Sequence, residues 1–337
     1  MTHSNISIFV PHIGCPCRCS FCNQNSITGV KTKVSEEDIM SAVALAKKSR
    51  GYDPTETEIA FFGGSFTAIE RGYMENLLKT ANKFLKDNSV FGIRISTRPD
   101  AIDKEVLEIL KKYGVTSIEL GAQSMCDDVL VKNSRGHLSA DVEKSSELIK
   151  SYGFSLGLQM MTGLYGSTPE KDRYTAERLI ELKPSTVRIY PTIILKNTVL
   201  AEKFLSGEYK TYSVEETVDL CAELVQLFRQ NGIEVIRTGL HSITDKDYVG
   251  GPWHPAFGEL VAGRIYLNNA LKQLKKTGDY TLFVNPKNIS MMVGQKRENI
   301  KKLGEMGFRC RVVGNGDLPL YEVKAMEMNT ENETEIN

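Results

Sequence analysis

Apolar runs and helical segments alternate between residues 6 and 238 of this 337-residue chain. Runs rich in β-branched and aromatic residues, which predict strands, lie at 6–10, 58–62, 92–97, 117–121, 154–161, 186–191 and 234–238. Helical segments separate them at 35–48, 71–86, 104–113, 140–152, 169–182 and 214–230. Because the runs are nearly continuous in apolar residues, they predict a parallel sheet that is covered on both faces. We therefore expect an α/β fold built as a barrel or partial barrel of βα units.

The loop after the first expected strand is unusually rich in cysteine. Residues 14–24 read GCPCRCSFCNQ and hold four of the chain's seven cysteines. In βα barrels, the loops at the carboxyl ends of the strands carry the chemistry, so this loop lies where a site is expected. The N-terminus shows no signal peptide, and no apolar run approaches the ~20 residues of a membrane span. We therefore expect a cytoplasmic protein without a membrane partner, in which clustered thiols serve metal or redox chemistry.

Three of these thiols, Cys15, Cys19 and Cys22, have the spacing C-x3-C-x2-C, and Cys17 lies between the first two. Three thiolates on one loop hold three irons of a cubane cluster and leave the fourth iron open to a small chelating molecule. A structural zinc site needs a second ligand pair, whereas the other cysteines and the five histidines are scattered. Zinc stays the alternative and requires Cys17, which is otherwise a spare thiol.

The cysteine spacing, together with Phe21 just before the last cysteine, resembles the signature of radical S-adenosylmethionine (SAM) enzymes. The resemblance implies a partial (β/α)6 barrel with a small C-terminal α/β domain, and two cofactors, a 4Fe-4S cluster and SAM. It also implies that Phe21 packs on the adenine. In this family the reduced cluster cleaves SAM to a 5′-deoxyadenosyl radical, which abstracts hydrogen from a substrate. An electron donor, unidentified here, is required.

Polar and small residues at the other strand ends match further motifs of the family. Gly63, Gly64 and Ser65 resemble the glycine motif that binds the methionyl amine. Residues 119–137, ELGAQSMCDDVLVKNSRGH, resemble the radical domain shared by the elongator catalytic subunit and oxygen-independent coproporphyrinogen III oxidases. The implied cofactor contacts in and around these motifs are Phe21, Gly63, Gly64, Ser65, Ser96, Glu119, Gln123, Arg135 and Gln159.

Within this set, the resemblance implies that Gln123 and Gln159 face the ribose and that Arg135 binds the carboxylate of SAM. An Arg fork suits a carboxylate, so the chemistry agrees with the resemblance. Tyr190 is a candidate catalytic group on the substrate side, and a barrel aromatic with a hydrated hydroxyl is its structural alternative. The porphyrinogen oxidases carry Glu near Ser96, and its absence favours the elongator branch.

The C-terminal part departs from the elongator subunit. Fewer than ~100 residues follow Leu260, so the acetyltransferase domain of that subunit is not expected. Instead, two helices flank a Gly-x-x loop between strands, as in a KH module, which grips nucleotides through a G-x-x-G loop. Here the loop reads Gly-Gln-Lys-Arg without the second glycine, and Gly294, Lys296 and Arg297 are the candidate RNA-binding residues. The alternative is a small α/β cap with a solvated charged face.

These observations predict four segments. They are a radical SAM partial barrel at 1–245, a lid or linker with a helix at 246–278, a small KH-like domain at 279–327 and a disordered tail at 328–337. The expected function is a radical SAM enzyme whose partners are SAM and RNA, with tRNA as the substrate. The alternatives are a radical SAM enzyme on a small porphyrinogen-like molecule, or a non-catalytic protein that binds zinc or RNA.

Overall fold

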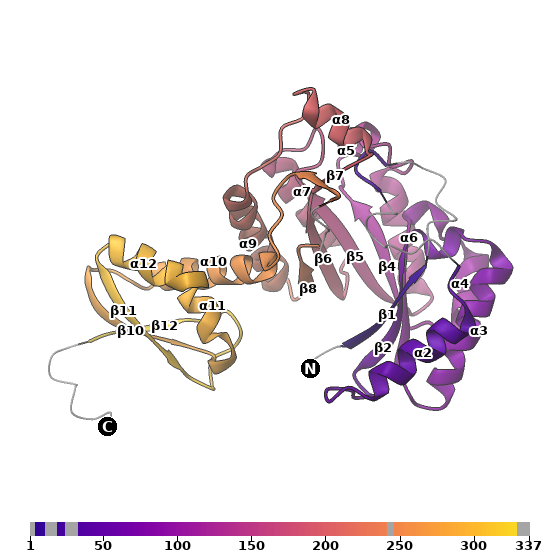
Figure 1. The fold of residues 1–337 in the computed structure, drawn as a ribbon, viewed down its shortest axis with the longest axis horizontal. Coiled ribbons are helices and arrows are strands. Elements are labelled where there is room, and N and C mark those ends of the chain that lie inside the picture. The colour runs from indigo at the N-terminus through magenta and orange to yellow at the C-terminus, as the bar shows by residue number, and fades with distance from the viewer. Residues whose placement is uncertain (1–3, 11–18, 24–32, 241–245, 329–337) are drawn as a thin grey trace. The chain divides into compact units, whose positions relative to one another are not determined.

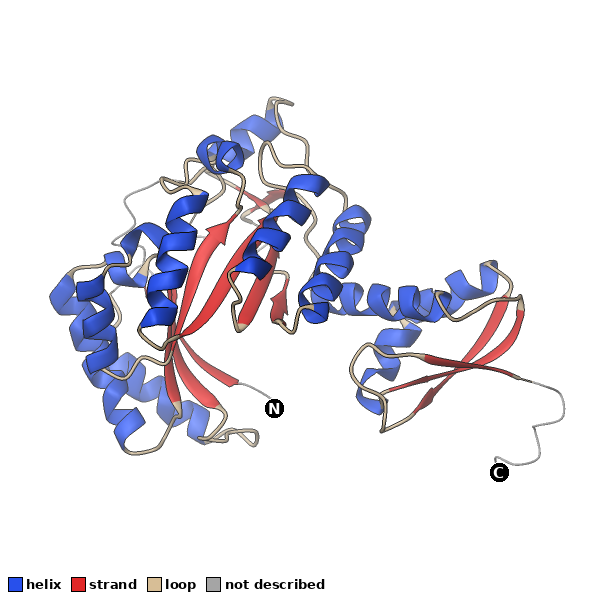
Figure 2. Ribbon diagram, turned by 180° about the vertical axis from the view of Figure 1, so that it is seen from behind, coloured by secondary structure: helices blue, strands red, loops and turns tan. Residues whose placement is uncertain are grey.

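In the computed structural model, the apolar runs form one sheet of seven parallel strands, in the order β1-β2-β3-β4-β5-β6-β8 (Figures 1 and 2). The strands are β1 (Ser4–Val10), β2 (Thr57–Gly63), β3 (Gly92–Thr97), β4 (Ser117–Gln123), β5 (Ser155–Thr162), β6 (Thr186–Pro191) and β8 (Glu234–Thr238). The structure describes residues 4–10, 19–23, 33–240 and 246–328. The predicted parallel sheet and partial barrel are thereby confirmed.

Eight helices in the described ranges alternate with or follow these strands along the chain. They are α2 (Glu36–Lys47), α3 (Arg71–Lys86), α4 (Lys104–Lys112), α5 (Asp127–Lys132), α6 (Ser139–Ser151), α7 (Pro169–Glu181), α8 (Val199–Leu205) and α9 (Val214–Gln230). Local signals set their ends. Ser35 and Asp38 form a capping box at α2, and the Thr168 side chain accepts from a backbone N–H in the first turn of α7. Two short strands, β7 (Ile194–Leu195) and β9 (Tyr248–Gly250), form a separate antiparallel ladder.

The two faces of the seven-stranded sheet differ in chemistry. Residues Ile118 and Leu120 of β4 and Leu158 of β5 are fully buried, and helix α6 packs on these two strands. The alternate positions carry polar side chains, such as Glu119 and Gln159, which contact one another. Since side chains alternate along a strand, the apolar set faces the helices and the polar set faces the interior of the barrel.

The chain packs as two compact units. One, here called the barrel unit, contains Met1–Tyr212 and Phe228–Trp253, and the other, the C-terminal unit, contains Ser213–Leu227 and His254–Asn337. Helix α9 thus contributes residues to both. The C-terminal unit also holds α10 (Phe257–Leu271), β10 (Gly278–Val284), α11 (Ile289–Val293), α12 (Glu298–Glu305), β11 (Phe308–Gly314) and β12 (Lys324–Glu327).

In the C-terminal unit, a three-stranded sheet has the order β11-β10-β12, with β11 parallel and β12 antiparallel to β10. Its core gathers Tyr266 and Leu282 with Met292 and Leu303, all fully buried. The apolar residues at 321–326 predict a strand, but the strand begins only at Lys324. Tyr321 has a φ of 68° and its backbone N–H donates to the Tyr266 hydroxyl, so this residue is not in an extended conformation.

Candidate active site at the carboxyl ends of the barrel strands

The described part of the cysteine loop, residues 19–23, is held in place by backbone contacts. Ser20 donates from its backbone N–H to the Asn133 carbonyl (3.0 Å) and from its hydroxyl to Asn133 Oδ1 (2.7 Å). The backbone N–H of Leu200, in α8, donates to the Ser20 carbonyl. The Cys22 N–H donates to the Cys19 carbonyl, which forms a tight turn. The loop is therefore fixed from two sides, whereas the predicted ligand Cys15 and the spare Cys17 lie outside the described residues.

Asn133 is the fixed point for this loop. It is fully buried, and its side-chain amide donates to the carbonyls of Val129 and Tyr165. Both amide hydrogens and the amide oxygen thus have partners, on helix α5, on the loop after β5 and on Ser20. A buried amide with all its groups paired is held in one orientation, so Asn133 fixes the distance between the cysteine loop and the loop that carries Arg135.

Arg135 bridges the cysteine loop and strand β4. Its Nη1 donates to Cys19 Sγ (3.3 Å), and its Nη2 donates to the Gly121 carbonyl (2.6 Å). The Arg98 guanidinium in turn donates to the Arg135 carbonyl (2.5 Å). The Nε of Arg135 is buried and has no hydrogen-bond partner among the described residues. An unused donor on a buried guanidinium is suited to bind the carboxylate of a ligand.

Gln123 ends strand β4 in a left-handed conformation, with a φ of 68°. The register between β4 and β5 shifts between Gly121 and Gln123, which marks an irregularity at the strand end. The Gln123 side chain is buried, and its Oε1 has no hydrogen-bond partner in the part of the chain that the structure describes. A Cβ at position 121 would lie 2.7 Å from the Gln123 amide nitrogen. Any residue larger than glycine there would therefore displace the Gln123 side chain.

The glycine motif after β2 brings the first two strands close together. Gly63 has a φ of 121°, and a Cβ there would lie 2.2 Å from the Val10 carbonyl oxygen. Gly64 follows it in the same bend. The Ser65 hydroxyl contacts the Thr97 hydroxyl (2.8 Å) and accepts from the Arg98 N–H (3.2 Å). Ser65 therefore joins β2 to β3 in this structure, and the backbone of the two half-buried glycines lies at the strand end.

Ser96, Glu119 and Gln159 meet in a buried network inside the barrel. The Gln159 amide donates to Glu119 Oε1, and the Ser96 hydroxyl lies 3.5 Å from the same oxygen. Arg188 Nε donates to Glu119 Oε2 (2.7 Å), and Arg94 Nη1 lies 4.0 Å from it. Glu119 is only 1% exposed, so its charge is balanced by these two guanidinium groups and not by water.

Phe21 and Tyr190 lie against one apolar cluster, formed by Val129, Met161 and Leu164. The Arg135 guanidinium carbon is 6.0 Å from the centroid of the Phe21 ring. Burial raises the pKa of Tyr190, which keeps its phenol protonated at neutral pH. The structure thus brings together Cys19, Phe21, Gln123 and Arg135 at the carboxyl end of the sheet, with Tyr190 beside the same cluster.

Two further buried titratable groups support these loops. Burial lowers the pKa of His137 to about 4, so its ring is neutral and its Nε2 donates to the Ala122 carbonyl. Burial raises the pKa of Asp172 to about 7. Asp172 accepts from the Gly163 N–H and from the Ser167 hydroxyl, and thereby closes the loop between β5 and α7.

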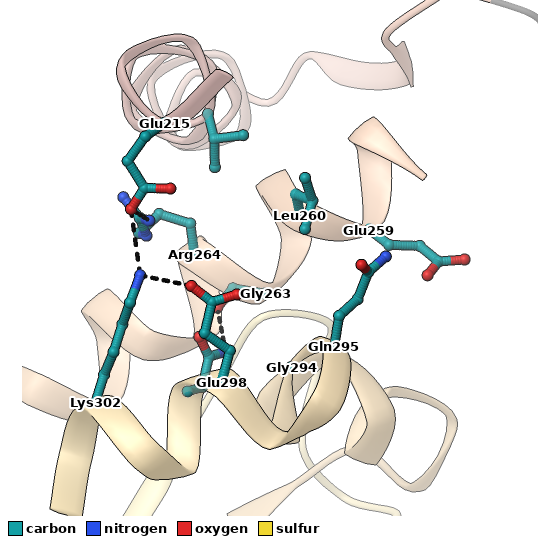
Figure 3. A pocket seen from close by; sticks show the side chains of 11 residues that line it. Glu215, Glu259, Leu260, Gly263, Arg264, Gly294, Gln295, Glu298 and Lys302 are labelled. Carbon is teal, nitrogen blue, oxygen red and sulfur yellow. Dashed lines mark hydrogen bonds and ion pairs between the residues drawn. The ribbon is translucent and has the colours of Figure 1, made fainter. Parts of the chain in front are cut away.

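The candidate RNA-binding loop belongs to the C-terminal unit. Gly294 has a φ of 77°, and Lys296 and Arg297 also have positive φ values, 49° and 62°. Both basic side chains are exposed and have no ion pair within the described ranges. Figure 3 shows that the neighbouring Lys302 reaches toward Glu298 and Glu215, to which it forms ion pairs of 3.0 and 3.2 Å. This network borders a cavity of only about 40 Å³.

Two statements about the chain follow from the described residues alone. Among the described residues, no group of three His, Cys, Asp or Glu side chains is placed to hold a metal ion. Cys15, the third predicted cluster ligand, is not one of the described residues. No described helix is long and apolar enough to cross a membrane.

Sequence reasoning missed several residues of this site. No local pattern assigns a role to Asn133, Arg98 or Thr97, because their contacts join segments far apart in the chain. The signal for Arg94 and Arg188 is stronger, because each is a charged residue at an alternate position of an otherwise apolar strand. Such a residue needs a partner on the same face of the sheet.

Comparison with known proteins connects this geometry to a family. The radical SAM superfamily matches residues 9–179, and the radical SAM C-terminal domain matches residues 184–266. The tRNA uridine(34) acetyltransferase of Dehalococcoides mccartyi is 25% identical over 256 residues, which cover 66% of this chain and 56% of that protein. Human Elongator complex protein 3 is 30% identical over 200 residues, or 53% of this chain and 37% of the relative.

A solved structure agrees with the fold. The archaeal Elp3 of Methanocaldococcus infernus superposes with a TM-score of 0.64 at 23% identity, over 82% of this chain and 66% of that one. The chain spans about half or less of the length of the two sequence relatives named above. The half-barrel fold and the match to the superfamily over more than half of the chain lead to one conclusion. This chain belongs to the radical SAM superfamily and is a radical SAM enzyme whose cofactors are a 4Fe-4S cluster and S-adenosylmethionine.

Proposed function

We propose that this protein is a radical SAM enzyme that modifies RNA, with tRNA as its substrate. When bound, the cluster and SAM supply a one-electron reductive cleavage that yields a 5′-deoxyadenosyl radical. One observation carries the assignment of the site: Arg135 joins the Cys19 sulfur to strand β4 and keeps a buried Nε without a partner. The physiological electron donor is a partner of unknown identity, and a cytoplasmic location follows from the tRNA substrate.

The residues of the barrel unit fit the two cofactors. Cys19 and Cys22, with Cys15 outside the described residues, would hold the cluster. The unpaired donor of Arg135 suits the SAM carboxylate, and the unpaired Gln123 Oε1 suits a ribose hydroxyl. Phe21 offers an apolar ring beside Arg135.

The remaining predicted contacts have more limited roles in this proposal. The backbone bend at Gly63 and Gly64 would receive the SAM amine. Ser65 and Ser96 are already paired within the protein, and the Gln159 amide is paired with Glu119. We therefore assign these three residues a structural role, in which they hold the strands that carry the SAM contacts.

The tRNA substrate has two supports. One is the similarity to a tRNA uridine(34) acetyltransferase, which extends over 66% of this chain. The other is the loop Gly294–Arg297, which presents Lys296 and Arg297 to solvent from between two short helices, as in a KH-like module. Backbone amides and basic side chains at such a turn suit phosphate groups. Lys302 is excluded from this role because Glu215 and Glu298 already pair with it.

Turnover on RNA tests this proposal. The full chain is reconstituted anaerobically, reduced with dithionite and incubated with SAM and bulk tRNA, and the tRNA nucleosides are then analysed by mass spectrometry. We expect a nucleoside of changed mass that requires both SAM and Cys19. If 5′-deoxyadenosine forms but no tRNA nucleoside changes, the radical chemistry stands and the RNA substrate is wrong.

A further inference from the structure

Charged side chains form an alternating series across the interior face of the barrel. Glu58 accepts from Arg94 Nε (2.8 Å), Arg94 lies 4.0 Å from Glu119, and Arg188 Nε donates to Glu119 (2.7 Å). All four side chains are 6% exposed or less. Each guanidinium in this series lies against a carboxylate, as buried charges require.

The series ends in Arg237, whose guanidinium follows that of Arg188 with no carboxylate between the two. Arg237 lies on β8, the edge strand of the sheet, and is the register partner of Arg188 on β6. It is half-buried, and its Nε donates to the Gly239 carbonyl (3.1 Å). Among the described residues no carboxylate forms an ion pair with it, and Glu234, the single acid of β8, is exposed at the other end of the strand.

The electrostatics of this edge are accordingly unbalanced. Burial and the positive charge of Arg188 both lower the pKa of Arg237, and Tyr190 opposes this effect only in part. The Tyr190 side chain lies within electrostatic reach of both Arg188 and Arg237. Two neighbouring guanidinium groups repel each other, and a bound anion relieves that repulsion.

Arg188 is also held in a defined orientation. Its Nε is used by Glu119, and its guanidinium carbon lies 5.2 Å from the centroid of the Phe62 ring. A guanidinium fixed at Nε and on one face keeps its Nη edge for a ligand. Two such donors beside a phenol hydroxyl match the tetrahedral oxygens of a phosphate group, to which Arg binds in a charge-assisted, bidentate manner.

We propose that Arg188, Tyr190 and Arg237 form a site for a phosphate group of the substrate inside the barrel. This inference rests on the proposed RNA substrate and makes it more specific, because it places a phosphate of the reacting nucleotide next to Tyr190. It assigns Tyr190 a binding role toward the substrate and requires no radical on this residue. The loop at Gly294–Arg297 in the C-terminal unit has no part in it.

Binding of small anions to the full chain tests this site without turnover. The probe is uridine 5′-monophosphate, titrated by calorimetry into reconstituted protein, with uridine, inorganic phosphate and malonate as separate arms. The variants are Arg237→Gln, Arg237→Lys and a control, Arg50→Gln, which removes an exposed arginine of the same unit. Loss of one charge-assisted contact corresponds to about a 10- to 150-fold weaker affinity.

We expect the monophosphate to bind wild type and Arg50→Gln equally, to bind Arg237→Gln at least tenfold more weakly and to regain affinity in Arg237→Lys. Uridine binds all four proteins alike. Equal affinity of wild type and Arg237→Gln overturns the site, as does a monophosphate that binds no better than uridine. Stronger binding of malonate than of phosphate also overturns it, in favour of a carboxylate-bearing substrate.

The result is separable from the proposed function. Failure of tRNA modification with intact monophosphate binding removes the RNA substrate alone and leaves the anion site. Loss of monophosphate selectivity with intact tRNA modification removes only the anion site. The unfolding midpoint of each variant in urea shows whether an altered affinity reflects a loss of folded protein.

Discussion

The barrel interior and the loop Gly294–Arg297 use charge in opposite ways. In the barrel, Glu119 is 1% exposed and is paired with Arg188 and Arg94. In the loop, Lys296 and Arg297 point to solvent without ion pairs in the described ranges. A buried charge that loses its partner is costly, whereas an exposed charge is solvated by water. Substitutions in the barrel should therefore change stability, and substitutions in the loop should change only binding.

The largest effect is expected at Glu119. The substitution Glu119→Gln leaves the guanidinium group of Arg188 buried without its carboxylate, whereas Arg94 keeps its pair with Glu58. Breaking one partner of a buried pair costs about 3–5 kcal/mol of unfolding free energy. The matched control is Glu170→Gln, whose side chain is 78% exposed and forms a surface ion pair with Arg173. It should cost less than about 1 kcal/mol. Urea unfolding of both variants measures the contrast, and equal losses would contradict it.

Asp172 predicts a pH dependence of stability in the barrel unit. Burial raises its pKa to about 7 in the folded protein, well above the ordinary value of an aspartate. Between about pH 4 and pH 7 the folded state therefore binds more protons at this group than the unfolded state, so the free energy of unfolding falls as pH rises. The loss totals about 4 kcal/mol and levels off above the folded pKa.

The substitution Asp172→Asn removes this titration. Urea unfolding at pH 5, 6, 7 and 8 should show a shallower fall for the variant than for the wild type. Parallel curves for the two proteins would mean that other groups set the pH dependence.

A smaller effect is expected at Asn133. The substitution Asn133→Ala leaves the Ser20 hydroxyl and the Tyr165 carbonyl without their partners, at a cost of about 1–3 kcal/mol. Because Asn133 holds the cysteine loop, the variant should also retain less iron after anaerobic reconstitution. The control Asn82→Ala loses one contact, to the Tyr113 carbonyl, away from the loop. Full iron content in Asn133→Ala would mean that the cysteine loop keeps its place without this side chain.

The smallest effect on stability is expected in the loop. The double substitution Lys296→Gln with Arg297→Gln should change the free energy of unfolding by less than about 0.5 kcal/mol. It should weaken tRNA binding and lower the slope of log affinity against log salt by about 1.4–1.8. The control removes Lys275 and Lys276, two exposed lysines of the same unit. An unchanged slope in the loop variant would exclude the loop from RNA binding.

The sequence predicted much of the fold because local patterns carry it. The strands at 92–97, 186–191 and 234–238 coincide with β3, β6 and β8, since their apolar runs and flanking turn residues lie within a few positions. For the third strand of the C-terminal sheet, β12, the predicted start at Tyr321 lies three residues before the observed start at Lys324. A contact between Tyr321 and Tyr266, 55 positions apart, fixes that segment, and no local pattern reports it.

The site was predictable in its motifs but not in its connections. Arg135 and Gln123 could be selected from a motif, whereas their unpaired atoms appear only in the folded structure. The contact between Ser20 and Asn133 spans 113 positions, and that between Glu119 and Arg188 spans 69. Such pairs depend on which strands become neighbours, so they follow from topology and not from spacing in the chain.

The central claim is that the carboxyl end of the barrel, with Cys19 and Arg135, holds the cluster and SAM for radical chemistry. The direct measurement is formation of 5′-deoxyadenosine by the anaerobically reconstituted full chain with dithionite, SAM and bulk tRNA. The account predicts 5′-deoxyadenosine from the wild type, none from Cys19→Ala and strongly reduced SAM affinity in Arg135→Gln. No 5′-deoxyadenosine from a wild type that carries a complete 4Fe-4S cluster, or undiminished formation by Cys19→Ala, would contradict it.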